Sequence, residues 1–463
     1  MPSRPHPYLS GNFAPLQGED TFCDLPVTGA LPRELVGRYL RNGPNPQFAP
    51  RDSNYHWFAG DGMVHAFTLG EGRASYLNRF VPTPKFELER AAGQALFGTF
   101  GNPLTSDPLA VGKDSGVANT NIVFHAGRLL ALEEGHQPFE LELGTLRAQG
   151  YRPYAGSFGR FTAHPKIDPQ TQELLFFGYG TGTVPFSNGM CFGVVDGRGE
   201  LVRLDGFEAP YAAMIHDFFV TRSYVVFPVL PLVGSLARAM RGQMPFAWEP
   251  QRNGYLGVMR RDGDISSLRW LVMDPCYVFH PMNMWEENDT IFVDVMEYDH
   301  APLFPDAEGR MGRDVPAFLS RWRLDLERAE VTRTPRDDLA GEFPRVDERR
   351  AGLSYRHGWY AARTTPDGKA LFNALAHVDH ARDERRLYHF SAGDVPGEPV
   401  FVPRTADAAE GDGFVLATVY RGESGRSDLA VFEATDLEQG PIALVHLPRR
   451  IPFGFHGQWV GGL

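Results

Sequence analysis

The chain has 463 residues, of which 43% are hydrophobic and 22% charged, and its formal net charge is −12. This acidic balance argues against nucleic acid as a partner, because binding to phosphates needs a basic face. The first residues lack the apolar core of a signal peptide, and no stretch approaches the roughly 20 apolar residues of a membrane-spanning helix. Three cysteines with loose spacing suit a reducing compartment (Cys23, Cys191 and Cys276). We therefore expect a soluble, cytoplasmic protein.

The N-terminal part begins with a proline-rich arm, residues 1–35. Residues 37–46 follow and are typical of a strand that runs into a cluster of turn residues. In residues 56–67 (HWFAGDGMVHAF) a Gly-Asp-Gly turn precedes an apolar strand, a pattern that predicts a hairpin. We expect residues 1–463 to form a single domain.

From about residue 110 onward, short β-branched or aromatic runs alternate with turns rich in Gly, Asp and Pro. Examples of such runs are residues 121–124, 173–179, 291–295 and 414–420. The 50 glycines and 37 prolines supply many turns and argue against a helical architecture. Many short strands at fairly even spacing predict an all-β barrel, sandwich or propeller.

Residues 229–248 (VLPLVGSLARAMRGQMPFAW) differ from this pattern and predict a short apolar helix. Its apolar face would carry Leu232, Leu236, Ala239 and Met240. Arg238 and Arg241 would lie off that face, where they could reach lipid phosphates. Two interpretations stay open: a helix that docks on a membrane interface or closes a pocket, and a helix that covers the core.

Four of the fifteen histidines lie in similar apolar runs, namely His164, His216, His280 and His456. Each one alone is more often a hydrogen-bonded core residue, but four in comparable contexts point to one shared metal ion. Their successive spacings are 52, 64 and 176 residues. A propeller blade takes about 40–50 residues, so successive blades could each deliver one histidine to a common axis. The spacing therefore favours the propeller.

Several motifs resemble the carotenoid cleavage oxygenase family, over a match that runs from about residue 20 to Leu463. The three longest are residues 41–46 (RNGPNP), 56–65 (HWFAGDGMVH) and 452–457 (PFGFHG). Shorter matches lie at residues 341–346 (GEFPRV), 397–403 (GEPVFVP) and 410–414 (EGDGF). The resemblance implies a seven-bladed β-propeller with a capping dome of loops and short helices.

The resemblance also implies a non-haem iron site. One Fe(II) per chain would be bound by His164, His216, His280 and His456. Three glutamates would each accept the Nδ1–H of one imidazole, namely Glu134, Glu342 and Glu398. His164 would be the ligand without such a glutamate, and Thr120 would lie beside the open coordination positions. Four neutral imidazoles leave the iron divalent, with two octahedral positions open.

The reaction that the resemblance implies is oxidative cleavage of a conjugated C=C bond. O2 is the co-substrate, and both of its atoms enter two carbonyl products. The alkene supplies all four electrons, so neither nicotinamide nor flavin is needed. The sequence accordingly lacks the Gly-x-Gly-x-x-Gly pattern of a dinucleotide site.

The substrate pocket is expected to include Phe58, Phe100 and Glu133. Lignostilbene-type members of the family hold a phenol oxygen with a lysine at the position of Glu133 and with a tyrosine. Residues 96–101, where that tyrosine is expected, contain none. Because a carboxylate repels a phenolate, we expect a carotenoid or apocarotenoid substrate. The alternative is a stilbene or phenylpropanoid of the lignostilbene or isoeugenol type.

A third interpretation is a non-catalytic propeller that binds lipid. The presence of all four histidine ligands argues against it. A carotenoid substrate resides in membranes and would enter through an apolar tunnel. Residues 229–248 are therefore expected to make a peripheral membrane contact at the mouth of this tunnel. The protein is otherwise expected to be a monomer or a weak oligomer.

Overall fold

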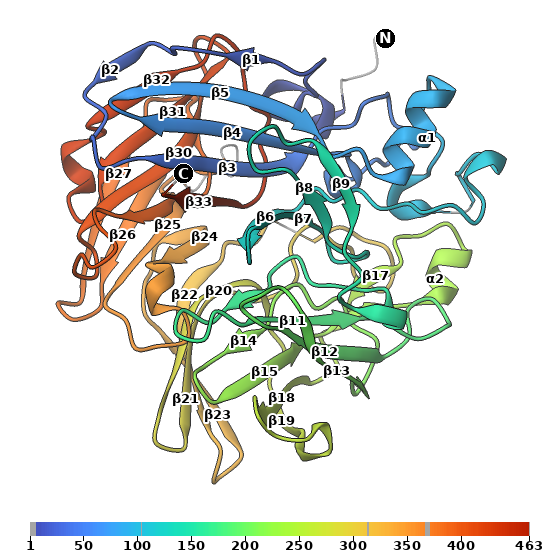
Figure 1. Ribbon diagram of the computed structural model, residues 1–463. Helices are drawn as coiled ribbons and strands as arrows, with labels where there is room; N and C mark the ends of the chain where they lie inside the picture. Colours follow the sequence, from blue (N-terminus) through green and yellow to red (C-terminus); the bar gives the residue numbers. More distant parts are fainter. Residues whose placement is uncertain (1–5, 103, 313, 366–370, 463) are drawn as a thin grey trace. The chain divides into compact units, whose positions relative to one another are not determined.

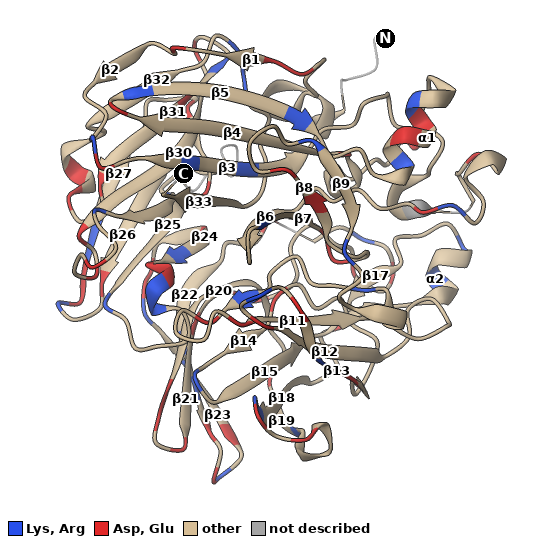
Figure 2. Ribbon diagram, viewed as in Figure 1, with Lys and Arg blue, Asp and Glu red and all other residues tan. Residues whose placement is uncertain are grey.

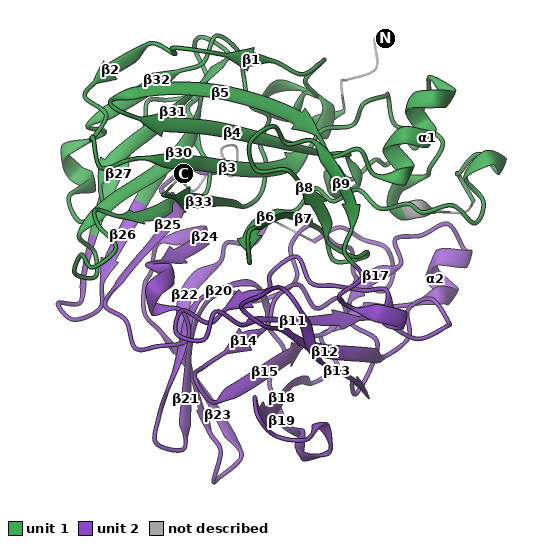
Figure 3. Ribbon diagram, in the orientation of Figure 1, with its two compact units in different colours: residues 1–152, 373–375, 386–463 green, residues 153–372, 376–385 purple. Residues whose placement is uncertain are grey.

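The computed structural model describes residues 6–102, 104–312, 314–365 and 371–462 (Figure 1). Strands dominate it, and in these ranges the α-helices are α1 (Pro84–Ala92) and α2 (Leu236–Met240). Seven sheets of four or more strands lie within the described residues. The predicted all-β class is therefore confirmed. The chain divides into two compact units, residues 1–152, 373–375 and 386–463, and residues 153–372 and 376–385 (Figure 3).

The first sheet of unit 1 joins both ends of the chain in the order β1-β5-β4-β3-β33. Its strands are β1 (Thr21–Phe22), β3 (Gly37–Pro44), β4 (Gly62–Gly70), β5 (Arg73–Phe80) and β33 (Gly457–Gly461). Strand β33 pairs with β3 in antiparallel register, with Leu40 opposite Gln458 and Arg41 opposite Gly457. The predicted returning strand is β4, which pairs with β3 so that Asn42 lies opposite Val64. The residues before the Gly-Asp-Gly turn form a 3-10 helix, Trp57–Ala59, rather than a strand.

Two further sheets complete unit 1. One has the order β6 (Asn121–His125), β7 (Arg128–Leu132), β8 (Phe139–Leu141), β9 (Ala148–Tyr151). The other has the order β2 (Val27–Gly29), β32 (Ala443–His446), β31 (Arg426–Glu433), β30 (Gly413–Arg421), β28 (Val395–Pro396), and β29 (Val400–Pro403) also pairs with β30. Apolar side chains from β3 and β4, such as Tyr39 and Phe67, share a buried core with Leu416 of β30 and Val431 of β31. This burial is the main stabilising contribution in unit 1.

Unit 2 contains three complete four-stranded antiparallel sheets. The first is β10 (Lys166–Ile167), β11 (Leu174–Tyr179), β12 (Gly189–Val195), β13 (Leu201–Glu208). The second is β14 (Phe219–Val220), β15 (Tyr224–Val229), β18 (Gly254–Arg260), β19 (Arg269–Met273). The third is β20 (Tyr277–Glu287), β21 (Thr290–Tyr298), β22 (Phe318–Asp325), β23 (Glu330–Pro335). In each, β-branched and aromatic residues fill a buried central strand, namely β11, β15 or β21, whereas outer strands such as β13 and β23 are largely exposed.

A seventh sheet has the order β24 (Ala340–Val346), β25 (His357–Arg363), β26 (Ala374–Asp379), β27 (Glu384–His389). Strands β24 and β25 belong to unit 2, whereas β26 and β27 contribute residues to both units. Helix α1 of unit 1 begins after Thr83, whose side chain accepts the Phe86 N–H, and ends at Gly93 with φ of 69°. Both are favourable helix caps. Charges of both signs lie on this helix (Figure 2).

The N-terminal arm is integrated into unit 1 rather than detached from it. Strand β1 pairs with β5, and β2 pairs with β32. Farther along, Asn45 accepts the Leu16 N–H and donates to the Leu16 carbonyl. The second asparagine of the 41–46 motif therefore fastens the arm.

The predicted helix over residues 229–248 is wrong in extent. The segment contains β16 (Leu232–Gly234), the five-residue α2 and β17 (Phe246–Trp248), and Leu232 pairs with Trp248 in a two-stranded ladder. Leu232 is fully buried, so it shares no exposed helical face with Met240, which is 73% exposed. The helix begins after Ser235, whose side chain accepts the Arg238 N–H, and ends before Arg241.

The predicted role of Arg238 toward lipid phosphates is also wrong. Its guanidinium is buried and donates to Glu249 Oε1 at 2.8 Å and to the Val233 carbonyl. Throughout the described ranges, the helices lack the combination of length and apolar character needed to cross a bilayer.

Candidate metal centre

Three of the predicted ligands lie together in unit 2. His164 precedes β10 by two residues, His216 precedes β14 by three, and His280 lies in the first half of β20. The Nε2 atom of His216 lies 3.0 Å from Nε2 of His164 and 3.1 Å from Nε2 of His280. The segments that lead into β10 and β14, together with β20 itself, therefore each bring one imidazole nitrogen to the same place.

The β20–β21 ladder is interrupted next to His280, and this interruption orients the His280 side chain. The register shifts on both sides of Pro281, which has no N–H to donate to the ladder. The Nδ1 atom of His280 lies 2.6 Å from Oε2 of Glu342. Glu342 lies in β24 at another register shift, and its Oε2 also accepts the Phe343 N–H. The other oxygen, Oε1, accepts the hydroxyl of Tyr298, and burial and this carboxylate raise the Tyr298 pKa well above its ordinary value.

His164 has a different carboxylate nearby. Its Nδ1 lies 3.9 Å from Oδ2 of Asp217, beyond hydrogen-bonding distance. Asp217 is buried, and its Oδ1 accepts from Lys166 Nζ at 2.6 Å and from the Phe218 N–H at 2.7 Å. The predicted exception of His164 among the ligands remains a prediction, since these contacts do not test it.

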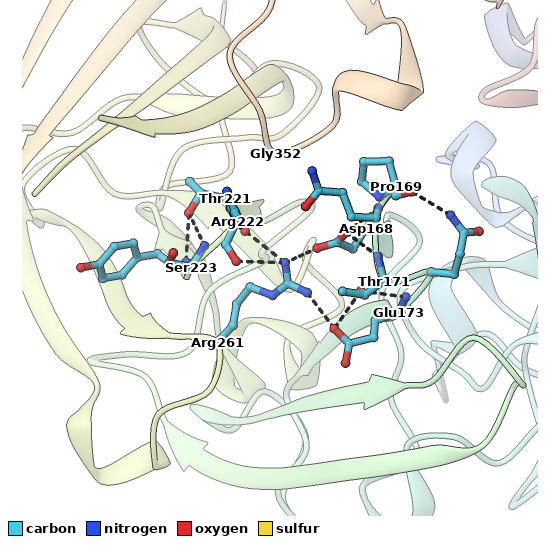
Figure 4. Close-up of polar contacts among 12 residues, drawn as sticks. Asp168, Pro169, Thr171, Glu173, Thr221, Arg222, Ser223, Arg261 and Gly352 are labelled. Carbon is cyan, nitrogen blue, oxygen red and sulfur yellow. Dashed lines mark hydrogen bonds and ion pairs between the residues drawn. The ribbon is translucent and has the colours of Figure 1, made fainter. Parts of the chain in front are cut away.

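Arg261 ties the strand that follows His164 to the strand that follows His216 (Figure 4). Its Nη1 donates to Asp168 Oδ2 at 2.5 Å and to the Thr221 and Arg222 carbonyls at 3.3 Å each. Its Nη2 donates to Glu173 Oε2 at 2.9 Å. Asp168 follows β10 and Thr221 follows β14, so this guanidinium fixes the ends of the two strands that come directly after His164 and His216. The Arg261 side chain is 12% exposed, which strengthens these charged hydrogen bonds.

The fourth ligand, His456, is held within unit 1. Its Nδ1 lies 2.9 Å from Oε1 of Glu398, and Oε2 of the same carboxylate accepts the Gly457 N–H at 2.7 Å. Both His456 and Glu398 are buried. An anionic acceptor at Nδ1 selects the tautomer that carries its proton there and leaves a lone pair on Nε2.

The 41–46 motif holds the segment that carries His456. Asn42 donates its N–H to the His456 carbonyl and accepts the Phe455 N–H, both at 2.9 Å. The buried Arg41 donates to the Gly454 carbonyl at 3.0 Å. A Cβ on Gly43 would lie 2.7 Å from the Gly454 Cα, so glycine at position 43 permits the close approach of the two backbones.

The glycine that begins the 397–403 motif also permits a close approach, in this case of a side chain. A Cβ on Gly397 would lie 1.7 Å from Nη1 of Arg41, so glycine makes room for that guanidinium. The next residue, Glu398, is the acceptor for His456. Sequence reasoning did not assign a role to Arg41 or Asn42, although a charged residue inside the motif was the available signal.

The four predicted ligands offer nitrogen atoms that all lie within 4.8 Å of one another. His164, His216 and His456 are buried, and the His280 side chain is 12% exposed. The donor set fits a metal ion. A neutral imidazole has one N–H and one lone pair, and Nδ1 of His280 and of His456 faces a carboxylate. His216 Nε2, close to two other nitrogens, can carry at most one proton, so lone pairs converge there. Imidazole donors without a carboxylate suit iron, copper, nickel or zinc.

The other predicted site residues belong to unit 1. The Thr120 carbonyl accepts the His456 N–H at 3.2 Å, and its hydroxyl donates to Asn119 Oδ1 at 2.9 Å. Phe58 lies against Phe455, with ring centroids 5.3 Å apart. Glu134 is half-buried and lies two residues after the end of β7. Its predicted contact with an imidazole stays a prediction.

Phe100 and Glu133 have distinct surroundings. Phe100 is 46% exposed, and its ring lies 5.4 Å from His56, which in turn contacts Phe58 at 4.4 Å. Glu133 Oε1 accepts the Val117 N–H at 2.6 Å and the Ala118 N–H at 3.1 Å, and lies 3.2 Å from His136 Nδ1. Its partners are thus a backbone loop and a histidine. Whether these residues line a substrate pocket remains a prediction.

Comparison with known proteins identifies the family. The family described as Retinal pigment epithelial membrane protein matches residues 13–461. The chain is 37% identical to isoeugenol monooxygenase of Pseudomonas nitroreducens, over 99% of this chain and 98% of that protein. It is 34% identical to a carotenoid cleavage oxygenase of Mycobacterium tuberculosis, over 98% of this protein and 97% of that one.

Among solved structures, the lignostilbene dioxygenase of Pseudomonas brassicacearum matches with a TM-score of 0.94 and 34% identity, over the full length of both proteins. The fold is therefore a seven-bladed β-propeller, with the seven sheets as its blades. The chain belongs to the carotenoid cleavage oxygenase family, as the motifs indicated. It is an enzyme, an oxygenase of that family.

Proposed function

We propose that this protein is an Fe(II)-dependent dioxygenase that cleaves the alkene bond conjugated to the aromatic ring of a phenylpropanoid or stilbene. The observation that carries the proposal is the convergence of four largely buried imidazoles, those of His164, His216, His280 and His456. The similarity to an isoeugenol monooxygenase and to a lignostilbene dioxygenase supports this substrate class. The expected carotenoid substrate is less well supported, although a carotenoid cleavage oxygenase is also among the relatives.

The objection to a phenolic substrate rests on the carboxylate of Glu133. That carboxylate accepts two backbone N–H groups and lies beside His136, so its negative charge is already engaged. Burial opposes its ionisation, but His136 and the two amides outweigh burial and lower the pKa of Glu133. The lowered pKa keeps Glu133 ionised, but its Oε1 is directed at the Val117 and Ala118 amides and at His136. The carboxylate is therefore already occupied by protein donors, and the case for a carotenoid weakens accordingly.

The residues of the site each have a task in this proposal. The four imidazoles would hold one iron ion, which when bound supplies the redox-active centre at which O2 reacts. Glu342 and Glu398 keep a proton on Nδ1 of His280 and His456, and thereby direct each Nε2 lone pair at the metal position. Burial of the ligands excludes water. Thr120, Glu134, Phe58 and Phe100 are proposed to line or support the reaction space.

The reaction balances without a further reductant. In R–CH=CH–R′ + O2 → R–CHO + R′–CHO, the C=C and O–O bonds break and two C=O bonds form. The alkene loses four electrons, and O2 gains them. The protein must therefore hold the alkene and O2 in one orientation, a contribution that reaches about 7–11 kcal/mol in favourable cases.

The test is aerobic incubation of the iron-loaded protein with isoeugenol, resveratrol and an apocarotenal, with products identified by mass. We expect two carbonyl fragments from isoeugenol or resveratrol, with one atom of label from 18O2 in each before exchange. An anaerobic sample and a His216→Ala variant should give neither. Cleavage of the apocarotenal alone would overturn the substrate class, and no cleavage of any substrate would overturn the dioxygenase proposal.

We further propose a weak peripheral membrane contact, which now depends on Leu236 and Met240 alone, 38% and 73% exposed. Burying such a side chain in lipid contributes about 1.5–3 kcal/mol. Liposome flotation should therefore be weak for the wild type and lost in a Leu236→Ser, Met240→Ser variant. Equal behaviour of the two proteins would refute the contact. Leu232 is kept, because it is fully buried and its replacement would disturb the fold.

A further inference from the structure

The loop of residues 117–120 occupies a strained and heavily bonded position in unit 1. Ala118 has φ of 45°, a left-handed conformation that is rare for a residue with a Cβ. Its N–H donates to Glu133 at 3.1 Å, and its carbonyl accepts from Asn42 Nδ2 at 2.9 Å. The preceding residue, Val117, donates to the same Glu133 oxygen at 2.6 Å. One carboxylate oxygen therefore holds two consecutive amides in an unfavourable backbone conformation.

The same loop leads directly to the candidate centre. Asn119 Nδ2 donates to the Phe58 carbonyl at 2.7 Å and to the Gly60 carbonyl at 2.6 Å. The Thr120 hydroxyl donates to Asn119, and the Thr120 carbonyl accepts the N–H of His456 at 3.2 Å. The loop thus connects Phe58, Thr120 and His456 through a continuous set of hydrogen bonds within one unit.

We infer that Glu133 is a positioning residue: its carboxylate fixes the 117–120 loop, and through it seats Thr120 and Phe58 beside His456. It does not bind the phenol oxygen of the substrate. Its partners are backbone N–H groups and His136, and its side chain is only 13% exposed. As far as turnover is concerned, this inference rests on the proposed function.

Three substitutions separate the positioning role from substrate binding. Glu133→Gln keeps an oxygen that can accept both amides. Glu133→Ala removes it, and Glu133→Lys replaces it with a group that can only donate. Glu142→Ala, which removes a more exposed glutamate of unit 1, is the matched control.

The first readout is hydrogen exchange of the peptide that contains Val117 and Ala118, which needs no turnover. Without the oxygen of residue 133 as acceptor, these two amides should exchange about tenfold faster in the Glu133→Ala and Glu133→Lys variants. The Glu133→Gln variant should exchange at about the wild-type rate. The control should exchange like the wild type. Unchanged exchange in Glu133→Ala would overturn the inference whether or not the protein cleaves alkenes.

The second readout compares isoeugenol with its O-methyl ether, which lacks the phenolic hydroxyl. A displaced loop should lower kcat about 10- to 100-fold on both substrates in the Ala and Lys variants, and Gln should restore most of it. A change confined to KM for the phenol, or improved turnover of the phenol by Glu133→Lys, would show that residue 133 contacts substrate and would overturn the inference. If the wild type cleaves neither substrate, the proposed function fails while the exchange result still stands.

Discussion

Glu398 holds His456 at two points: Oε1 lies 2.9 Å from the ring Nδ1, and Oε2 accepts the next backbone N–H, that of Gly457, at 2.7 Å. Glu342 contacts His280 only at Nδ1, and its other hydrogen bonds come from the Phe343 N–H and the Tyr298 hydroxyl. At His456, by contrast, the Glu398 carboxylate contacts both the ring and the adjacent backbone. One carboxylate therefore sets both the tautomer of a ligand and the backbone around it.

Replacing Glu398 by Gln should weaken metal binding more than it weakens the fold. The amide oxygen can still accept the Nδ1–H, but it lacks the charge that makes the imidazole a strong donor. Such changes typically cost about 10–100-fold in metal affinity or activity. Titration of the metal-free variant with Fe(II) under anaerobic conditions would measure this. Glu348→Gln, an exposed glutamate, is the control, and equal affinities in all three proteins would contradict the assigned role.

Replacing His164, His216, His280 or His456 by Ala should each reduce bound iron to well below one ion per chain. The fold should persist, because the apolar core clusters of both units contain none of the four histidines. Iron content by elemental analysis and far-ultraviolet circular dichroism give the two readouts. The exposed His389 provides a matched control, and full iron occupancy in all four variants would refute a shared site.

Folding stability should fall as the pH drops below about 6.5, the ordinary histidine value. Burial lowers the pKa of His56 to about 3, and burial with the nearby Arg41 and Arg450 lowers that of His65 to about 3. Between these values the unfolded chain binds protons that the folded chain does not. The free energy of unfolding should therefore decrease by up to about 1.4 kcal/mol per pH unit for each histidine.

Urea unfolding at several pH values would measure this slope. His65→Gln should make it shallower between pH 6.5 and about 3, because it removes one of the two groups, whereas His389→Gln should leave it unchanged. A slope equal to that of the wild type in His65→Gln would show that His65 takes no part in the acid destabilisation.

Arg261→Met should destabilise the protein by about 3 kcal/mol, because it leaves the largely buried Asp168 side chain and two carbonyls without their charged donor. Its neighbour Arg260 pairs with Asp262 at the surface, so Arg260→Met should change stability little. Chemical denaturation distinguishes the two variants. Because the Arg261 contacts lie between the strands that follow His164 and His216, metal affinity should also fall in the first variant alone. Equal stability of the two variants would refute the stabilising role assigned to the buried Arg261 guanidinium.

The residues that could be predicted from the sequence are those whose local context carries the signal. The histidines at 164, 216, 280 and 456 share apolar flanks, and the family motifs surround the last of them. The strands were visible because short β-branched runs end in Gly, Asp or Pro turns. Both signals are local, so an isolated sequence retains them.

The environment of Glu133 could not be predicted, because its partners lie 15 and 16 residues earlier and meet it only through the β6–β7 fold. The helix predicted over residues 229–248 failed for a related reason. Apolar residues four apart fit a helix, but Leu232 instead pairs with Trp248 across a ladder that no local pattern reveals. Buried Arg41 was missed because arginine is seldom an interior residue.

The pairing of β3 with β33 has a consequence for how the protein folds. Leu40 and Gln458 are opposite each other although more than four hundred positions separate them in the sequence, and such long-range contacts form slowly. Because His456 directly precedes β33, the last ligand is held in place only when this pairing forms. We therefore predict that acquisition of tight metal binding is a late kinetic step, coincident with protection of the Leu40 and Gln458 amides in pulse-labelled refolding. Metal capture that clearly precedes this protection would show that three imidazoles suffice.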